Sequence, residues 1–532
     1  MERLNIMFAS KANCDKWLYD RSNWEQTRKD LNMMDAINYF EKGSKDFPVE
    51  YLYKPCMCQD DAEYRLEIMH ELLSNVTLFQ SLSDFCLIMR RFRTLFRDYK
   101  EDKHEIQKQY RFLLLFGEFM AIASHLKIIL ANAQSQGLKD AGDFCSKIID
   151  SETIQSGYSI ASELLCEIGG ILKNAGISIN PYEKTVTVID CEESGETGLL
   201  KDEIFDVYGI KIRNSFSIVD PMPLSYLEEK VLYVLMDKDD NMEIFENMKI
   251  LCGEYADKVM DDIKTFIELL PQFVFYVSYI EFVTLVGQFG IPACKPIFDE
   301  NGFTASDCAG ITLILKFIME SQPLENIIRN DIRLPKSGMF ILSGPNQGGK
   351  TIYLKALGLS AYLAKCGCYV FCKECRIPFY DNILTHFMQK EVLGKSRLVE
   401  EIERIEKIAE EFNRDSLVLL NESFTSTRRK DSLEIAMHYI NKFDKIGCSV
   451  GFVSHFYEIP ETYNNGKNDI ISLRSGIAGD GVRTYKISEQ KSDGLAYARD
   501  IAKNCGMTYE QLTDDIQNIN NINKIKNTAE VK

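Results

Sequence analysis

The 532-residue sequence lacks a long uninterrupted apolar run. Its longest candidate, residues 269–280, is interrupted by polar side chains and flanked by Glu268 and Glu281. A membrane-spanning helix needs about 18 or more predominantly apolar residues, so we expect a buried helix here and no membrane partner. The first residues, 1–4, carry no basic segment followed by an apolar core and a cleavage site. We therefore expect no secretory signal and a cytoplasmic protein.

Positive charge is also scarce. The net charge is −17, and it is unevenly distributed, because residues 1–330 carry −19 whereas residues 331–532 carry +2. An acidic surface repels the phosphate backbone of nucleic acid. The first part of the chain is therefore poorly suited to binding a polyanion over a broad area.

Residues 1–180 have few prolines and glycines and show apolar residues at three- and four-residue spacing, which predicts helices. The clearest helical segments are 61–82, 105–133 and 153–174. Residues 185–189 alternate like a strand, and residues 192–198 resemble a turn-rich loop. Helical spacing returns from residue 226 to about residue 289, with a predicted break at Pro271.

From residue 291 onward, short apolar segments alternate with helical ones, an order that predicts an α/β domain with a mostly parallel sheet. We expect strands at 338–342, 369–371, 416–420 and 449–453, and helices at 352–365, 398–412 and between the last two strands. The sequence thus predicts a helical domain over 1–290, with a strand-containing insertion near 177–224, an α/β domain over 291–515, and a tail over 516–532 that is either a frayed helix or disordered.

A phosphate-binding loop is the most specific motif in the chain. Residues 344–351 match the pattern G-x-x-x-x-G-K-[ST] between an expected strand and an expected helix. Its glycines allow backbone N–H groups to surround phosphates, Lys350 reaches the β- and γ-phosphates, and the Thr351 hydroxyl can bind Mg²⁺. We therefore expect ATP and Mg²⁺ as cofactors. The predicted nucleotide-binding residues of this loop are Gly344, Pro345, Asn346, Gln347, Gly348, Gly349, Lys350 and Thr351.

Polar residues follow two further expected strands. Asn421 and Glu422 follow 416–420, where P-loop ATPases hold the metal and the attacking water, usually with Asp-Glu. Asn421 offers a neutral oxygen for the metal, so we expect weak Mg²⁺ binding. Glu422 can act as the general base. His455 follows 449–453 and can sense the γ-phosphate, so we expect Glu422 and His455 to be catalytic.

Together these motifs resemble the MutS family of DNA mismatch-repair ATPases. The family's T-G-P-N-M-[SG]-G-K-S is similar to residues 343–351, and its T-H-[YF]-x-E to residues 454–458. Further similar segments are Asn330-Asp331-Ile332, Gly367-Cys368-Tyr369-Val370, Gly394-Lys395-Ser396-Arg397, Asp493-Gly494-Leu495 and, more faintly, residues 64–69. The resemblance is specific from about residue 325 to residue 512.

The resemblance implies a helical core and lever domain followed by a P-loop NTPase domain of the ABC-like type. It further implies a homodimer formed through the ATPase domain, composite ATP sites, and levers that relay the ATP state. In such a dimer Ser396 contacts the nucleotide of the opposing subunit.

Several positions depart from the family pattern. Phe424 stands where the family has glycine, and we expect it to stiffen and crowd a loop that approaches the partner's nucleotide. Arg397 replaces a threonine of the signature loop. The chain begins almost directly in the core domain, so we expect no mismatch-reading or connector domain. Phe116-Gly117-Glu118 resembles the mismatch-reading Phe-x-Glu, but it lies in an apolar helical run and is interpreted as core.

Two other local patterns allow more than one interpretation. The cysteines at 366, 368, 372 and 375 have the short spacing of a zinc site, but strand alternation would separate neighbouring thiols, so we favour buried thiols. Such thiols behave as small hydrophobic groups in a reducing compartment. The basic residues 428–430 can either touch a partner's phosphates or form a solvated loop, which we favour.

Two functions remain open. The first is a dimeric, DNA-associated ATPase related to mismatch repair, with slow Mg²⁺-dependent hydrolysis. The alternative is an ATP-dependent switch or scaffold that binds protein partners and has lost mismatch reading, which Asn421, Phe424 and the expected lack of the N-terminal domains favour. A transporter-type or chromosome-structuring ATPase fits poorly, because no L-S-G-G-Q-like signature is present.

Overall fold

The computed structural model describes residues 4–103, 105–180, 185–190, 242–388, 397–424, 427–456, 459, 470–478, 482–490 and 513, without the side chains of 170–180, 185–190 and 397. The chain forms two compact units that do not follow its linear order. The first contains residues 1–14, 43–48 and 67–280. The second contains residues 15–42, 49–66 and 281–532.

The first unit is helical, as the sequence predicts. Its helices pack through aromatic side chains, and Phe85, Phe119 and Phe273 are fully buried among them. Phe116 is also fully buried, which confirms the core interpretation of the Phe-Gly-Glu segment. The helices wholly within this unit are α6 (Val76–Glu101), α7 (Glu105–Ile129), α8 (Gln136–Ile149) and α9 (Glu152–Asn174). Four more are divided between the units, namely α1 (Lys11–Tyr19), α3 (Met33–Gly43), α5 (Gln59–Ser74) and α12 (Met242–Gln288).

Two expectations about these helices are wrong. Residues 61–82 do not form one helix, because Asn75 ends α5 and its side-chain oxygen accepts a hydrogen bond from the N–H of Leu78 at the start of α6. The two helices meet at a bend of 107°. The break predicted at Pro271 is absent, since α12 continues through it. Leu269, Leu270 and Phe273 around the proline are fully buried, and this packing offsets the missing N–H of the proline.

By length and composition, α7 and α12 are apolar enough to cross a membrane, and the bent pair α5–α6 also passes this test. However, 61% of the apolar window in α7 and 72% of that in α12 is buried inside the protein. The packing of the helical unit therefore explains their apolar character.

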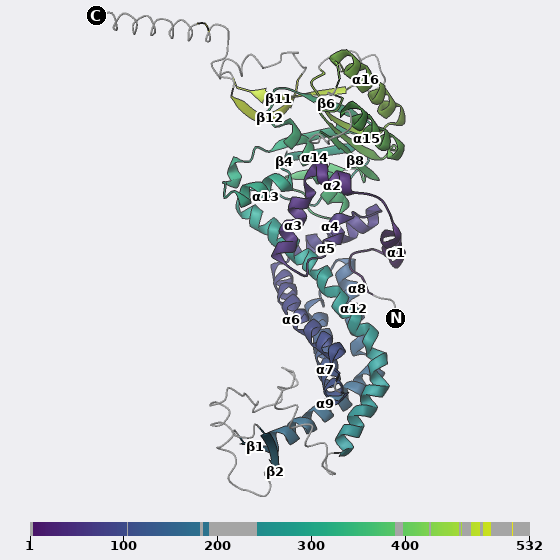
Figure 1. The fold of residues 1–532 in the computed structure, drawn as a ribbon, viewed down its shortest axis with the longest axis vertical. Coiled ribbons are helices and arrows are strands. Elements are labelled where there is room, and N and C mark those ends of the chain that lie inside the picture. The colour runs from purple at the N-terminus through teal and green to yellow at the C-terminus, as the bar shows by residue number, and fades with distance from the viewer. Residues whose placement is uncertain are drawn as a thin grey trace, which may run out of the picture. The chain divides into compact units, whose positions relative to one another are not determined.

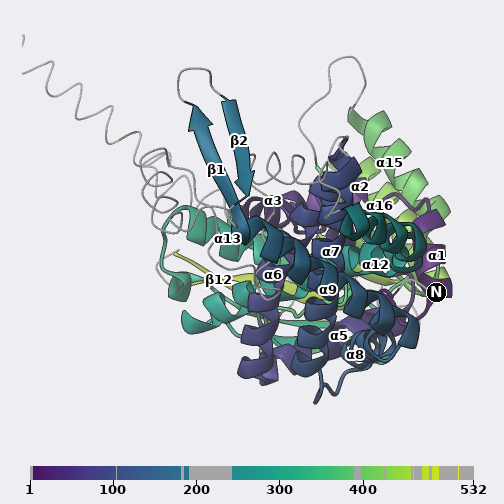
Figure 2. The same cartoon turned by 90° about the horizontal axis from the view of Figure 1, so that it is seen from below.

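The strand expected at 185–189 is confirmed. It is β2 (Thr185–Asp190), paired antiparallel with β1 (Ala175–Asn180), and Figure 2 shows the two as a ribbon at the end of α9. The expected loop at 192–198 and tail at 516–532 lie outside the described residues.

The second unit is a mixed α/β structure, as the sequence predicts, and its main sheet has six strands in the order β12-β11-β6-β10-β9-β8. All neighbouring pairs are parallel except β11–β12. The predicted strands 338–342, 416–420 and 449–453 are confirmed as β6, β9 and β10. The strands are β6 (Met339–Ser343), β8 (Asn382–Phe387), β9 (Ser416–Asn421), β10 (Ser449–Val453), β11 (Ile470–Ile477) and β12 (Arg483–Glu489).

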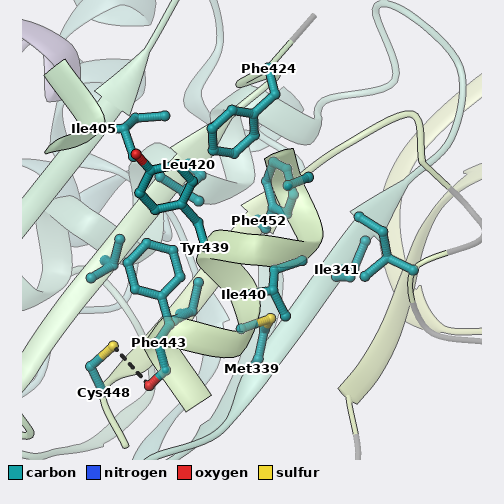
Figure 3. Close-up of a cluster of buried hydrophobic side chains, with 14 of the residues drawn as sticks. Met339, Ile341, Ile405, Leu420, Phe424, Tyr439, Ile440, Phe443, Cys448 and Phe452 are labelled. Carbon is teal, nitrogen blue, oxygen red and sulfur yellow. Dashed lines mark hydrogen bonds between the residues drawn. The ribbon is translucent and has the colours of Figure 1, made fainter. Parts of the chain in front are cut away.

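Helices cover this sheet, and the predicted helices at 352–365 and 398–412 are confirmed. They are α14 (Lys350–Lys365) and α15 (Arg397–Glu411), with α16 (Arg429–Ile446) between β9 and β10. Figure 1 shows α15 and α16 side by side, and the rings of Phe412 and Phe443 lie 5.1 Å apart beneath them. Figure 3 shows the core under α16, where Tyr439, Ile440 and Phe443 point toward the strands.

A second sheet of four strands, ordered β3-β7-β4-β5, completes the unit. Its strands are β3 (Ile297–Phe298), β4 (Gly302–Cys308), β5 (Asn330–Pro335) and β7 (Glu374–Ile377), and it is accompanied by α13 (Ile311–Met319) and the 3₁₀ turn at Leu324–Asn326. The strand expected at 369–371 is wrong, because only Val370 makes a bridge, to Cys294. Both backbone hydrogen bonds of that bridge are formed, so the polar backbone groups of Val370 have partners although residues 369–371 do not form a regular strand.

The N-terminal segments of the second unit pack on its α14 and β8. The segment 15–42 contains α2 (Glu25–Leu31), and 49–66 contains α4 (Glu50–Tyr53). A Cβ added at Gly358 of α14 would lie 2.6 Å from Leu31 and 2.7 Å from Leu419 of β9, so α14 is held tightly between α2 and the sheet. The Tyr362 hydroxyl donates to the carbonyl of Leu52 at 2.8 Å.

Asp30 of α2 is the main polar link in this packing. Its buried carboxylate accepts hydrogen bonds from Thr385 Oγ1 at 2.9 Å, from Phe387 N at 3.2 Å and from the guanidinium of Arg404 at 3.3 Å, and also from Gln26. One side chain from the N-terminal segment therefore fixes the end of β8 and the middle of α15.

We predict that Asp30→Ala destabilises the second unit by about 2–4 kcal/mol, because it leaves a buried N–H, a hydroxyl and a guanidinium without their acceptor. Chemical denaturation followed by circular dichroism measures this loss. The matched control is Asp35→Ala, which removes an exposed carboxylate close by in the chain and should change stability by about 0.5 kcal/mol or less. Equal stability of the two variants would contradict the assigned role of Asp30.

Candidate functional site

The loop 344–350 joins the end of β6 to the start of α14. Gly344 and Gly349 have φ angles of 126° and 86°, values that favour glycine, and Gly349 directly precedes the helix. Gln347 also has a positive φ, of 60°. The loop thus turns back over the first turn of α14, where free N–H groups and the helix dipole favour an anion.

The underside of this loop rests on Ser475 of β11. A Cβ at Gly348 would lie 2.5 Å from Ser475 Oγ, and one at Gly344 would meet the same atom. Only glycine fits at both positions, so the backbone can approach closely there. Ser475 Oγ is buried and has no hydrogen-bond partner in the part of the chain that the structure describes. The loop therefore has the close backbone packing, possible only with glycine, that is typical of phosphate-binding loops.

Lys350 faces into the loop. Its side chain is 4% exposed, and its ammonium donates to the carbonyls of Gly344 at 3.1 Å and Pro345 at 2.9 Å. Burial lowers the pKa of Lys350, and the nearby carboxylate of Glu422 opposes this effect. An ammonium held by two neutral carbonyls has unused capacity for an anion, as a phosphate-binding lysine requires.

The carboxyl ends of β6, β9 and β10 lie at one edge of the sheet. Val453 of β10 is paired with Leu342 of β6 on one side and with Asn421 of β9 on the other. The residues that follow these strands therefore converge. Thr351 Oγ1, at the start of α14, donates to Asn421 Oδ1 at 3.0 Å, which places two oxygens suited to Mg²⁺ next to each other.

Glu422 and His455 also meet at this edge. The imidazole Nε2 of His455 lies 3.4 Å from the Glu422 carboxylate, and the N–H of Glu422 donates to the carbonyl of Val453 at 2.9 Å. The hydrogen bond from His455, together with the charge of Lys350, holds the pKa of Glu422 below its usual range. The carboxylate is consequently ionised at neutral pH and can accept a proton.

The structure thus brings together most of the site residues that the sequence predicts. Pro345 is buried in the loop, and Asn346 and Gln347 are exposed on its outer side. Ser396 lies outside the described residues, as does the segment 493–495.

Residues of β11 and β12 also border the loop, and the sequence interpretation missed them. Besides Ser475, the Tyr485 ring of β12 lies 3.5 Å from the position of a Cβ on Gly349, and Asn330 holds the strand by donating to the carbonyl of Tyr485 at 3.1 Å. The positive charge of Arg483 contributes to the lowered pKa of Lys350. The Asp480-Gly481 dipeptide, typical of hairpin turns, is the one signal in the sequence that could have predicted these strands.

Phe424 differs from its expected role. Its φ is 67°, a conformation that suits the glycine of the family pattern, but its ring is fully buried. The ring stacks on Tyr439 with centroids 5.5 Å apart and an interplanar angle of 15° (Figure 3). The side chain is therefore an anchor of the turn in the core and does not project into solvent.

The four cysteines with zinc-like spacing are all buried, as the favoured interpretation predicts. Within the described residues, no group of three or more histidine, cysteine or acidic side chains is placed to hold a metal ion. Cys372 Sγ instead lies 3.5 Å from Cys294 Sγ. The basic residues 428–430 are exposed, and Arg429 begins α16.

Comparison with known proteins relates the site to one family. The family model "MutS domain V" matches residues 340–511, a range that includes the loop, Asn421, Glu422 and His455. The curated relatives include proteins named DNA mismatch repair protein MutS. That of Thermosipho melanesiensis is 31% identical over 53% of this chain and 34% of its own length. That of Thermotoga petrophila is 24% identical over 87% of this chain and 61% of its own length, and that of Fervidobacterium nodosum is 26% identical over 79% and 50%.

The chain therefore spans between about a third and three fifths of the length of these relatives. The relatives extend the similarity beyond the α/β unit, because one of them aligns with 87% of the chain. With the loop and the three following polar residues at one sheet edge, and the matched range covering that edge, residues 340–511 of this chain form a domain of the MutS family.

Proposed function

We propose that the chain binds ATP with Mg²⁺ and acts as a dimeric, DNA-associated ATPase related to mismatch repair. One observation carries the proposal. The Gly-Lys-Thr loop, Asn421, Glu422 and His455 lie at one edge of a parallel sheet, where Thr351 bonds Asn421 and His455 pairs with Glu422. This is the arrangement that an ABC-like P-loop NTPase fold needs for phosphate binding and hydrolysis.

The proposed role of each site residue follows from the chemistry of its polar groups. Residues 344–349 would surround the phosphates with backbone N–H groups, and Lys350 would exchange its two loop carbonyls for phosphate oxygens. Thr351 and Asn421 offer the oxygens for Mg²⁺, which neutralises phosphate charge when bound. Glu422 would orient the attacking water and accept its proton, while His455 holds the Glu422 carboxylate in place. Because Asn421 carries no charge, we expect hydrolysis to be slow.

Dimerisation and lever movement are further parts of the proposal. In the MutS family pattern the ATPase domains pair, and the segment containing Ser396 completes the partner's nucleotide site. α12 is one of the four helices that contribute residues to both units, and we expect the ATP state to reach the helical unit through it. We place the protein in the cytoplasm, where its buried thiols remain reduced.

A second function is supported by the charge distribution. Residues 1–330 carry a net charge of −19, which weakens attraction to DNA. Asn421 in place of an aspartate favours nucleotide binding over rapid turnover. The alternative is therefore an ATP-dependent switch or scaffold for protein partners.

Lys350→Ala should abolish ATP binding, because it removes the cation that faces the phosphates. Titration of the full chain with a fluorescent ATP analogue and Mg²⁺ measures the affinity, and we expect a loss of at least about 100-fold. Lys355→Ala is the matched control on the same helix, since its ammonium bonds Asn32 and not the loop. Tight ATP binding by Lys350→Ala would show that the loop is not the nucleotide site.

Asn421→Asp should strengthen metal binding, because a carboxylate replaces a neutral amide next to Thr351. We expect the Mg²⁺ concentration for half-maximal hydrolysis to fall by about 10-fold and the steady-state rate to rise. The affinity for ATP in the presence of EDTA serves as the internal control and should not improve. If the rate and its Mg²⁺ dependence are unchanged, Asn421 does not limit hydrolysis.

DNA binding separates the two functions. A DNA-associated protein should bind homoduplex or mismatched duplex at low salt, with an affinity that falls steeply as salt increases. Fluorescence anisotropy at several salt concentrations, with and without ATP, measures this. ATP-dependent dimerisation without any DNA binding at low salt would rule out the first function and favour the switch.

A further inference from the structure

A histidine–serine pair is buried behind the proposed catalytic edge. His386 Nδ1, on β8, lies 2.7 Å from Ser423 Oγ, and both residues are 0% exposed. Ser423 directly follows Glu422 in the chain. The pair therefore joins the turn after β9 to the neighbouring strand, one residue away from the proposed general base.

The imidazole of His386 is neutral. Burial, together with the charge of Arg404, lowers its pKa to about 3. Within the part of the chain described, His386 Nε2 makes no hydrogen bond. Ser423 Oγ also lies 3.4 Å from the His386 carbonyl, so the hydroxyl can donate there and accept from Nδ1–H. Since a buried nitrogen without a partner is costly, the bond to Ser423 is the one feature that favours histidine over an apolar residue here.

The turn that Ser423 occupies has an unusual backbone. Glu422 and Phe424, on either side of Ser423, have φ angles of 54° and 67° without being glycine. Such conformations persist when the surroundings fix them, and they cluster at functional sites. Three contacts fix this turn, namely the bond from Ser423 to His386, the burial of the Phe424 ring against Tyr439, and the bond from the N–H of Glu422 to the carbonyl of Val453.

The anchor point on β8 is itself held firmly. On the two sides of His386, Thr385 and Phe387 donate to Asp30, and Arg404 donates to the carbonyl of Phe387 at 3.1 Å. Asp30 and Arg404 come from α2 and α15, so two helices fix the end of this strand. A group that is bonded to His386 is therefore tied to a rigid part of the sheet.

We propose that His386, acting through Ser423, is a positioning residue that holds Glu422 in the orientation required for hydrolysis. The inference rests on the proposed ATPase function and adds a residue to it. Ser423 cannot shift without breaking a buried hydrogen bond, and Glu422 is its direct neighbour in the chain, so a shift of Ser423 would displace the backbone that carries Glu422. A general base displaced by about 1 Å loses much of its effect on the rate, whereas ATP binding by the loop does not depend on this turn.

Three single variants of the full chain and one double variant test the proposal. His386→Leu removes the hydrogen bond and keeps most of the volume, and Ser423→Ala removes its other partner. His386→Asn is the conservative control, because its amide can occupy the position of Nδ1. Single-turnover hydrolysis gives the rate of the chemical step, and titration with the fluorescent ATP analogue gives its Kd.

We expect His386→Leu and Ser423→Ala each to slow hydrolysis by about 10-fold or more while the Kd stays within about 2-fold. His386→Asn should retain the rate within about 3-fold, and the double variant His386→Leu/Ser423→Ala should be no slower than either single variant. A purely structural role predicts that His386→Asn is slower than His386→Leu, since the smaller polar Asn would disturb an apolar core more than Leu does. It also predicts that ATP affinity and the hydrolysis rate fall together.

Hydrolysis at the wild-type rate by the His386→Leu or Ser423→Ala variant would overturn the proposal. A parallel loss of ATP affinity and hydrolysis rate would also overturn it. If His386→Leu fails to fold, Ser423→Ala and His386→Asn still decide the question. Failure of the proposed function gives a different result, because wild-type protein would then not bind ATP at all. If the wild-type protein binds ATP without hydrolysing it, the positioning role of His386 is wrong, but the proposed ATP binding is not contradicted.

Discussion

The parallel register of three strands is the constraint on which the candidate site depends. β10 lies between β6 and β9, and its last residue, Val453, is paired with Leu342 near the end of β6 and with Asn421 at the end of β9. Parallel strands have their carboxyl ends at the same edge of the sheet, so the residues that follow each strand lie close together. The chain separates Lys350 from His455 by about a hundred residues, yet the register returns both to one place.

Precision at this edge comes from close packing around it. Ser475 lies against the phosphate loop so tightly that Gly344 and Gly348 leave no room for a side chain. Behind Glu422, the His386–Ser423 bond and the stacked ring of Phe424 fix the turn. The loop is thus supported from β11, and the base from β8 and α16. The proposed binding loop and the proposed general base thus have separate supports, so we expect a substitution to affect one without the other.

The parts that sequence predicts best are those with strong local patterns. β6, β9 and β10 are continuous apolar runs ending in polar residues, which is typical of strands buried on both faces. β11 and β12 carry polar and partly exposed residues such as Arg474 and Tyr485, so no alternation marks them. Residues 369–371 have a strand-like composition, but their environment allows only one bridge. Pro271 shows the reverse case, where packing overrides a local preference.

Local sequence patterns also decide which residues of the candidate site can be predicted. Lys350, Thr351, Asn421, Glu422 and His455 were predicted because each belongs to a motif at a strand end. Ser475 and His386 belong to no motif, and their roles arise from contacts with residues far away in the sequence. Phe424 was recognised as a departure from the family pattern. However, only the structure shows that its ring packs inward, because a positive φ at one residue decides the direction of its side chain.

The N-terminal segments around Asp30 and Leu52 have a consequence for how the protein is made. They pack on α14 and β8, which lie some 300 residues later in the chain. On the ribosome, the first residues of the second unit therefore emerge long before the strands that they cover. Their apolar side chains, such as Leu31, therefore have no packing partner until the whole helical unit and α14 have been synthesised. Folding of the α/β unit is thus a late event in synthesis, since long-range contacts form only after both partners exist.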